Sequence, residues 1–236
     1  MKKDFIKGMT NGIPIMLGYL SVSFGFGITA VSKGISALWA SLISLTNITS
    51  AGQAAGVDII AAGGTLLEMV LVQITINMRY SLMALSLSQR LDKKFTTPHR
   101  LAASYGITDE IFAVCAAQPE PLTPAFMYGM IFVAALGWVS GTAIGAMAGQ
   151  LLPTAVTNAM GLLLYGMFIA IVVPPAKKER GVLAVSLIAV VISLLFKYLF
   201  TAVSVGFATV ICAIAASLLG AWLFPVKYKY ERGAEK

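Results

Sequence analysis

The stretch LLEMVLVQITINMRYSLMALSL, residues 66–87, is apolar enough and long enough to cross a membrane as one helix. About 20 apolar residues, each rising about 1.5 Å along a helix, span a hydrocarbon core of about 30 Å. Polar and charged side chains nevertheless lie within the stretch: Glu68, Gln73, Thr75, Asn77, Arg79 and Tyr80. Because charges at membrane depth are costly, those that persist mark functional positions. The stretch therefore predicts a membrane helix with a polar role.

The rest of the chain is equally apolar. Of its 236 residues, 58% are hydrophobic and 11% are charged, and the mean hydropathy is +0.85, whereas soluble domains are roughly half apolar and a quarter charged. The predicted fold class is all-α: a polytopic integral membrane helical bundle of about six to seven transmembrane helices, forming a single transmembrane transporter domain over residues 1–236. The predicted spans are Ile13–Ser32, Leu66–Leu87, Pro124–Leu152, Val156–Val173, Val182–Phe200 and Val203–Phe224.

Two further segments are ambiguous. Leu38–Gly56 begins apolar but runs into the polar sequence TNITSAGQ at residues 46–53, and Leu101–Ala117 carries Asp109 and Glu110 at its middle. Polar, irregular backbone is tolerated at membrane depth only where protein or a water-filled cavity covers it. Both segments are therefore candidates for broken or re-entrant helices.

The basic residues favour the re-entrant assignment. Most of the 17 Lys and Arg residues fall in four clusters: Lys2, Lys3 and Lys7; Arg90, Lys93, Lys94 and Arg100; Lys177, Lys178 and Arg180; Lys227, Lys229, Arg232 and Lys236. If both ambiguous segments turn back, all four clusters and both termini face the cytoplasm, as the positive-inside rule prefers. An assignment of seven spans, with one ambiguous segment crossing, stays open. The basic N-terminus is expected to lead into a retained first helix, because no small-residue cleavage site follows it.

The charged residues within apolar segments are the candidates for a transport path. Arg79 needs a partner, and Asp109 or Glu110 is the natural one, either in a functional site or in a structural ion pair that fixes helix packing. Thr108 is predicted to cap a helix whose first turn holds both acids. A carboxylate whose surroundings disfavour charge can carry a proton, although the two acids could equally serve only as a helix cap. We predict that the polar breaks gather these residues: Gln53, Asn77, Arg79, Tyr80, Thr108, Asp109 and Glu110.

A series of glycines recurs every fourth residue at Gly137, Gly141, Gly145 and Gly149. On a helix these positions form one face, and small residues allow another helix to approach closely. The series predicts a helix-packing surface or a partner interface, with the facing helix either internal or external.

Several functional classes are disfavoured. The only histidine, His99, lies in a basic loop, and neither an H-E-x-x-H nor a G-x-S-x-G pattern occurs, so no enzyme, metal site or cofactor is predicted. The basic residues lack interleaved aromatics, which argues against nucleic-acid binding. A passive channel and an assembly subunit remain alternatives to a transporter, because polar breaks also line pores.

Four sequence elements, in this order, resemble the AzlC family, the large subunits of branched-chain amino acid exporters. They are Pro14–Gly27, the polar break ending at Gln53, INMRYSLM at residues 76–83, and GITDEIF at residues 106–112. The resemblance covers roughly residues 11–175 and implies a multi-pass protein of the bacterial cytoplasmic membrane. It also implies export of leucine, isoleucine or valine, driven by the proton-motive force, with a small AzlD-like membrane subunit as partner.

The sequence departs from the family pattern at the first break. Residues 46–52 read TNITSAG where many relatives have a Phe-Ala-Gly-like run, and Ala54 follows Gln53 where relatives often place an aromatic residue. These positions lie where a substrate could be read, so transport of a different amino acid or related metabolite stays an alternative.

Overall fold

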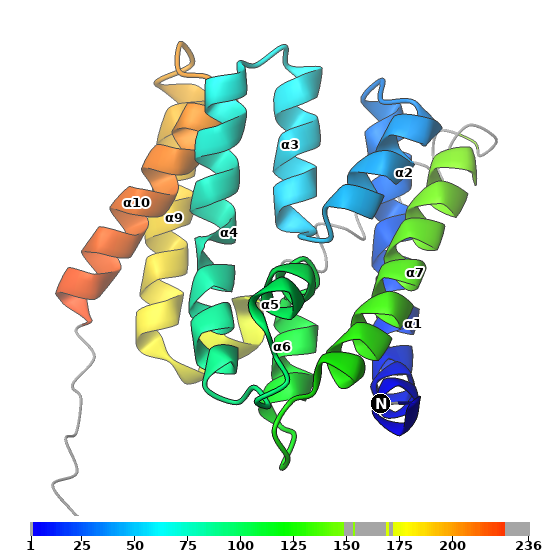
Figure 1. Ribbon diagram of the computed structural model, residues 1–236. Coiled ribbons are helices and arrows are strands. Elements are labelled where there is room, and N and C mark those ends of the chain that lie inside the picture. Colours follow the sequence, from blue (N-terminus) through cyan, green and yellow to red (C-terminus); the bar gives the residue numbers. More distant parts are fainter. Residues whose placement is uncertain (1, 149–152, 154–168, 170–171, 225–236) are drawn as a thin grey trace, which may run out of the picture. The chain divides into compact units, whose positions relative to one another are not determined.

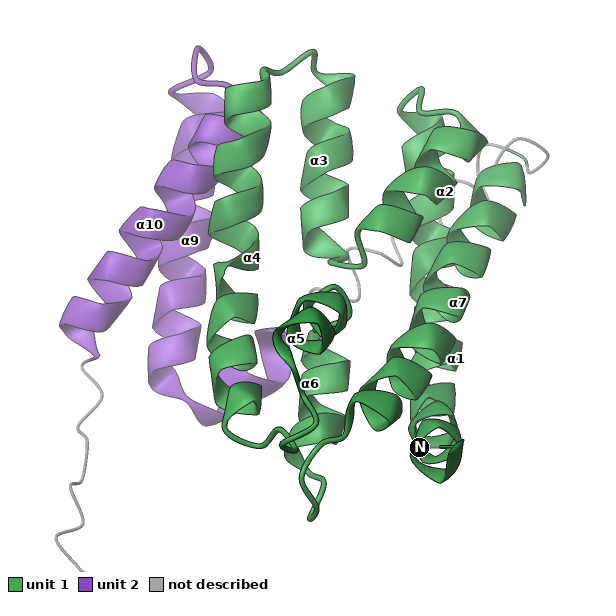
Figure 2. Ribbon diagram, viewed as in Figure 1, with its two compact units in different colours: residues 1–168 green, residues 169–236 purple. Residues whose placement is uncertain are grey.

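The computed structural model describes residues 2–148, 153, 169 and 172–224. The chain divides into two compact units, residues 1–168 and residues 169–236 (Figure 2). Within the described residues, five helices are long and apolar enough to cross a membrane, and no strand forms beyond a single bridge between Leu91 and Leu122. The predicted helical membrane bundle is thereby confirmed. The predicted span Val156–Val173 lies largely outside the described residues.

The core of unit 1 is a parallel pair of helices, α1 (Lys2–Ser32) and α7 (Pro124–Ala148) (Figure 1). Glycines on both helices bring the backbones into contact: a Cβ added at Gly12 would lie 3.0 Å from the Met130 carbonyl oxygen, and one at Gly137 would lie 2.7 Å from Met16 Cγ. A Cβ at Gly145 would lie 2.8 Å from Phe24 Cα. The helix that faces the glycine series is therefore internal.

Three members of the predicted glycine series, Gly137, Gly141 and Gly145, are buried in this contact with α1. The fourth, Gly149, lies outside the described residues. Larger side chains at the three buried positions would force the helix backbones apart.

The first ambiguous segment is a broken hairpin of two short helices, α2 (Ala37–Thr46) and α3 (Ala51–Ala61). Their 10 and 11 residues correspond to about 15 Å each, half of a hydrocarbon core. An ion pair joins Lys33, just after α1, to Asp58 near the end of α3. The hairpin thus starts and finishes at the same end of α1, as a re-entrant element does.

The chain then runs back along α4 (Leu66–Ser88). Thr65 and Glu68 form a capping box at its start: the Glu68 amide donates to Thr65 Oγ1 over 3.2 Å, and the Thr65 amide donates to Glu68 Oε2 over 3.4 Å. Because a capping box satisfies two otherwise unpaired helix amides, the buried Glu68 has a local structural role.

The second ambiguous segment is also broken, into α5 (Thr97–Ser104) and α6 (Asp109–Ala116). Arg90, before α5, donates to the carbonyls of Ala116 and Gln118 at the end of α6. Lys7 of α1 pairs with Glu120 over 3.2 Å. The second hairpin therefore starts and finishes at the end of unit 1 where α1 begins, opposite to the end from which the first hairpin enters (Figure 1).

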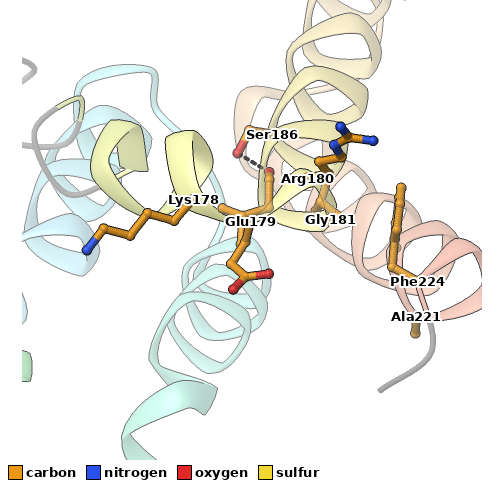
Figure 3. Close-up of a pocket in the computed structure, with 10 residues that line it drawn as sticks. Lys178, Glu179, Arg180, Gly181, Ser186, Ala221 and Phe224 are labelled. Atoms are coloured by element: carbon orange, nitrogen blue, oxygen red, sulfur yellow. Dashed lines mark hydrogen bonds between the residues drawn. The ribbon is translucent and has the colours of Figure 1, made fainter. Parts of the chain in front are cut away.

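Unit 2 contains a hairpin of α9 (Arg180–Tyr198) and α10 (Val205–Leu223), matching two predicted spans. A pocket of about 850 Å³ lies beside the start of α9 and the end of α10, lined by Lys178, Glu179, Arg180, Gly181, Val182, Val185, Ser186, Gly220, Ala221 and Phe224 (Figure 3). The side chains of Lys178 and Arg180 point in opposite directions (Figure 3), so the pocket does not converge positive charge.

Candidate functional site

The breaks of the two hairpins contact each other. The hydroxyl of Tyr105, which follows α5, donates to the carbonyl of Leu45 in the last turn of α2 over 2.6 Å. Carbonyls in the last turn of a helix lack an intrahelical donor, so this tyrosine satisfies a group that the break leaves free. The contact joins two half-length hairpins that enter unit 1 from opposite ends.

The start of α6 is held by Thr108 and Tyr19. Thr108 is the N-cap residue, as predicted, and its hydroxyl accepts from the Ile111 amide over 3.3 Å. The Tyr19 hydroxyl of α1 lies 2.6 Å from Thr108 Oγ1 and 2.7 Å from Glu110 Oε2. Since Thr108 and Tyr19 are both buried, Glu110 is anchored to the core of unit 1 through hydroxyl groups.

Asp109 faces the other way, toward α4. Its Oδ2 lies 3.0 Å from Arg79 Nη1, and the two side chains are 34% and 42% exposed. Arg79 also donates to the Tyr80 hydroxyl over 3.2 Å and lies 5.0 Å from the centre of the Tyr80 ring. The expected partnership between Arg79 and an acid of the second break is therefore present in the structure, and it is not sealed inside the protein.

Gln53 lies in a separate, deeply buried network. Its Nε2 donates to Ser44 Oγ over 2.9 Å, and its Oε1 accepts from the Trp138 indole over 2.8 Å. Ser44 in turn lies 2.7 Å from the Thr142 hydroxyl. This network fastens α3 to α2 and α7, and Trp138 packs edge-on against Tyr19 at a ring-centre distance of 5.1 Å. Gln53 is thus linked to the acidic cluster through the rings of Trp138 and Tyr19.

Asn77 belongs to a third group, which faces α3. Its Nδ2 donates to Gln73 Oε1 over 3.0 Å, and Gln73 Nε2 donates to the Gly52 carbonyl over 2.8 Å. Two buried oxygens in these segments, Asn77 Oδ1 and Thr49 Oγ1, have no hydrogen-bond partner within the described part of the protein. Ser50, between Thr49 and α3, has a positive φ of 53°, a strained conformation for a non-glycine residue that is concentrated at functional sites.

The structure therefore brings together Arg79, Tyr80, Thr108, Asp109 and Glu110, and it places Gln53 and Asn77 in two neighbouring networks. Sequence reasoning missed Tyr19 and Trp138, because each stands alone in an apolar stretch. It also missed the hydroxyl partners Ser44, Thr49 and Thr142, since serine and threonine are common in membrane helices and give no local signal.

Two further expectations concern metals and the histidine. Among the described residues, no group of three or more His, Cys, Asp or Glu side chains is placed to hold a metal ion. His99 lies in α5 rather than in a loop, and its Nδ1 is 2.8 Å from the Tyr128 hydroxyl. Pro98 occupies the first turn of α5, where proline is tolerated, and this explains why a loop was expected there.

The sequence of this chain is similar to those of known membrane proteins. Residues 14–152 match the family described as AzlC protein. The chain is 31% identical to an uncharacterized membrane protein of Archaeoglobus fulgidus over 92% of this chain and 94% of the relative. It is 27% identical to the inner membrane protein YgaZ of Escherichia coli over 92% and 91% of the two chains.

A third relative is the branched-chain amino acid transport protein AzlC of Bacillus subtilis, which is 24% identical over 71% of this chain and 66% of the relative. No solved structure matches the chain. The family match covers more than half of the chain and includes both broken hairpins together with α4, α7 and the part of α1 from residue 14 onward. The chain is therefore a membrane protein that belongs to the AzlC family.

Proposed function

We propose that this protein exports branched-chain or similar small hydrophobic amino acids across the cytoplasmic membrane, driven by the proton-motive force. The observation that carries the proposal is the meeting of two half-length hairpins at a polar cluster, joined by the Tyr105–Leu45 hydrogen bond. Transporters build substrate sites from discontinuous helices of this kind, because the break exposes helix ends and polar backbone near mid-membrane. The name of the Bacillus subtilis relative supports amino acids as the substrate class.

Arg79 and Asp109 form the element that responds to substrate. Their pair joins α4 to the second break and is partly exposed, so a substrate carboxylate can compete with Asp109 for the guanidinium. Arginine suits this role because it binds carboxylates in a planar, bidentate geometry. Exchange of one carboxylate for the other would release α6 from α4 and couple binding to movement of the second hairpin.

Glu110 is the better candidate of the two acids for the coupling proton. It is held by the hydroxyl of Tyr19 rather than by the guanidinium that pairs with Asp109. A carboxyl group can remain hydrogen-bonded to hydroxyls in either protonation state, since hydroxyls both donate and accept. Glu110 can therefore change its charge while the Arg79–Asp109 ion pair stays intact.

Both termini are proposed to face the cytoplasm. The basic residues Lys7 and Arg90 lie at one end of unit 1, which fits the positive-inside rule.

A small membrane subunit of the AzlD type is the proposed partner. Since α1 covers Gly137, Gly141 and Gly145, the partner must contact other faces. The apolar side chains of Ile74, Met78 and Leu82 on α4 are more than half exposed within the described part of the chain.

The test is transport of labelled leucine in proteoliposomes with an imposed proton gradient. We expect transport that saturates with substrate and collapses when the gradient is dissipated. Arg79→Gln and Asp109→Asn should abolish it, while the control Lys94→Gln, in the loop between α4 and α5, should retain it. Flux that rises linearly with concentration and ignores the gradient would instead identify a passive channel.

A further inference from the structure

We propose that Tyr19 is a positioning residue that keeps the empty transporter from changing conformation until Glu110 takes up a proton. The inference rests on the proposed function and names how proton uptake at Glu110 controls the second hairpin. It follows from a difference between the two sides of α6, because an ion pair joins the start of this helix to α4 and hydroxyl groups join it to α1.

The Tyr19 hydroxyl lies at the centre of a short chain of hydrogen bonds. It is 2.6 Å from Thr108 Oγ1 and 2.7 Å from Glu110 Oε2, but a tyrosine hydroxyl carries one proton to donate. An ionised carboxylate only accepts, so Tyr19 donates to Glu110, and the Thr108 hydroxyl donates to the Tyr19 oxygen. Thr108 is able to do so because its oxygen caps α6 as an acceptor, from the Ile111 amide. Both bonds therefore point toward the charge of Glu110.

The Tyr19 ring is held in place by its neighbours. It is 7% exposed and packs edge-on against Trp138 of α7, with 5.1 Å between the ring centres. The Trp138 indole in turn donates to Gln53 over 2.8 Å, and α1, which carries Tyr19, packs closely against α7 along the glycine series. A movement of α6 away from α1 must therefore break the bond between Tyr19 and Glu110.

Protonation of Glu110 weakens this bond. A hydrogen bond to an ionised group is roughly twice as strong as one between neutral groups, and a protonated carboxyl forms the weaker kind. Glu110 is exposed within unit 1, whereas Tyr19 is buried. A proton from solution can thus reach the carboxylate, and its effect is passed to a buried contact between α6 and α1.

The other charged and titratable groups around Glu110 leave this role to Tyr19. Asp109 on the same turn and Tyr80 of α4 interact electrostatically with Glu110, and Arg79 pairs with Asp109. No charged residue occurs in α7, and its Tyr128 lies against His99. Within the described part of the chain, Tyr19 alone is hydrogen-bonded to the Glu110 carboxylate.

Two contacts on opposite sides of α6 suit an exporter that exchanges substrate for protons. Such a transporter must stay locked when it is empty, and either ligand must release it. A substrate carboxylate releases α6 from α4 by competing for Arg79, and a proton releases α6 from α1 by weakening the bond to Tyr19. The helix then turns about the contact that remains. With neither ligand bound, both contacts hold the second hairpin in place.

The experiment compares exchange with net efflux of labelled leucine from proteoliposomes at equal pH on both sides. Net efflux requires the empty transporter to return, whereas exchange does not. Tyr19→Phe keeps the ring and removes the donor. At about pH 8 its net efflux should exceed that of the wild type by about tenfold, the effect of one hydrogen bond to a charged group. Its net efflux should no longer depend on pH, and its exchange should change by less than about twofold.

Three further variants serve as controls. Tyr128→Phe also removes a tyrosine hydroxyl from a hydrogen bond, and its net efflux should keep the pH dependence of the wild type. Glu110→Gln keeps Tyr19 as a neutral partner, so its net efflux at about pH 8 should rise as well. The double variant Tyr19→Phe/Glu110→Gln should match Tyr19→Phe, because Tyr19 acts through Glu110.

Several outcomes would overturn the inference while leaving the proposed function intact. The first is net efflux by Tyr19→Phe at the rate and pH dependence of the wild type. The second is an equal loss of exchange and net efflux, which would make Tyr19 a structural residue only. Additive effects in the double variant would also contradict it. Unchanged net efflux by Glu110→Gln at about pH 8 would do so whether or not Tyr19→Phe folds. If transport by the wild type ignores both pH and an imposed gradient, the proton-driven function fails together with the inference.

Discussion

The guanidinium of Arg79 lies 3.0 Å from the carboxylate of Asp109, across the interface between α4 and α6. The two residues are 30 positions apart in the sequence, and the pair exists only because α6 starts at the depth that Arg79 occupies on α4. Removal of either partner leaves the other charge without its counter-ion within an apolar segment, at a cost that the partial exposure of both side chains reduces. The pair is thus both a connection between helices and a site that a charged substrate can open.

The first prediction concerns this pair. Arg79→Gln and Asp109→Asn should each lower the free energy of unfolding. The loss in the double variant should be smaller than the sum of the two single losses by about 1 kcal/mol or more. A double-mutant cycle from thermal unfolding in detergent measures this coupling. Additive losses would show that Arg79 and Asp109 act independently, and transport by the double variant would remove the pair from the mechanism.

The second prediction separates the two acids. Glu110→Gln should retain exchange of labelled for unlabelled amino acid but lose dependence on the proton gradient, because its neutral amide keeps the Tyr19 hydroxyl as a partner without taking up a proton. Asp109→Asn should lose both activities. Counterflow and gradient-driven transport in the same proteoliposomes distinguish the two variants. Gradient-driven transport by Glu110→Gln at the wild-type rate and pH dependence would remove Glu110 from proton coupling.

The third prediction concerns the contact between the two breaks. Tyr105→Phe removes the donor to the Leu45 carbonyl and should cost about 1 kcal/mol of unfolding free energy, together with a lower transport rate. Tyr128→Phe is the matched control, since that hydroxyl joins α7 to His99 of α5 rather than one break to the other. Equal transport rates in the two variants would mean that the hairpins do not communicate through Tyr105.

The fourth prediction tests the close contact of α1 and α7. Gly141→Ala should destabilise the protein strongly, because the new Cβ would overlap Ser23 and the Leu20 backbone. Gly18→Ala, also in a helix interior, meets nothing within 4 Å and should be neutral or stabilising by up to about 1 kcal/mol. The yield of folded protein and its thermal midpoint report the difference. Similar midpoints for both variants would contradict the tight contact.

The fifth prediction concerns topology. A cysteine introduced at Lys94, in the loop before α5, should resist an impermeant thiol reagent added outside intact cells, whereas one at Ala62, after α3, should react. Both positions are exposed, and they lie at opposite ends of unit 1. Strong labelling at Lys94 from outside would reverse the proposed orientation.

Sequence patterns were sufficient for the long helices of the described residues and for the breaks, although α1 begins at Lys2, 11 residues before the predicted span Ile13–Ser32. The span predicted at residues 66–87 and α4 agree to within one residue. The thickness of the membrane sets the length of apolar sequence that a crossing helix needs, so such a helix can be predicted without knowledge of its tertiary contacts. The broken character of Leu38–Gly56 and Leu101–Ala117 was readable because polar backbone must be covered at that depth. The partnership of Arg79 with an acid followed from the cost of an isolated charge.

The hydrogen-bond networks that connect the helices could not be predicted from the sequence in the same way. Gln53 was expected beside Arg79, but it is instead bonded to Ser44 and Trp138. The partners of Gln53 depend on which side chain of α7 faces the start of α3. The sequence of two parallel helices with a glycine contact does not show how far one helix is shifted along the other. The glycine series itself predicted a close helix contact, yet only the structure identifies α1 as the helix that fills it.

The parallel contact between α1 and α7 also has a consequence for biosynthesis. Met16 and Gly137 touch, but they are separated by about 120 residues of chain, which a ribosome adds in roughly 6–24 s at 5–20 residues per second. During that interval the glycine-bearing face of the first helix has no native partner, while both hairpins and α4 are inserted. The helix made first thus gains its α7 contact only after the helices between them have been made, and until then lipid or an insertion chaperone has to cover the face of α1 that later packs against α7.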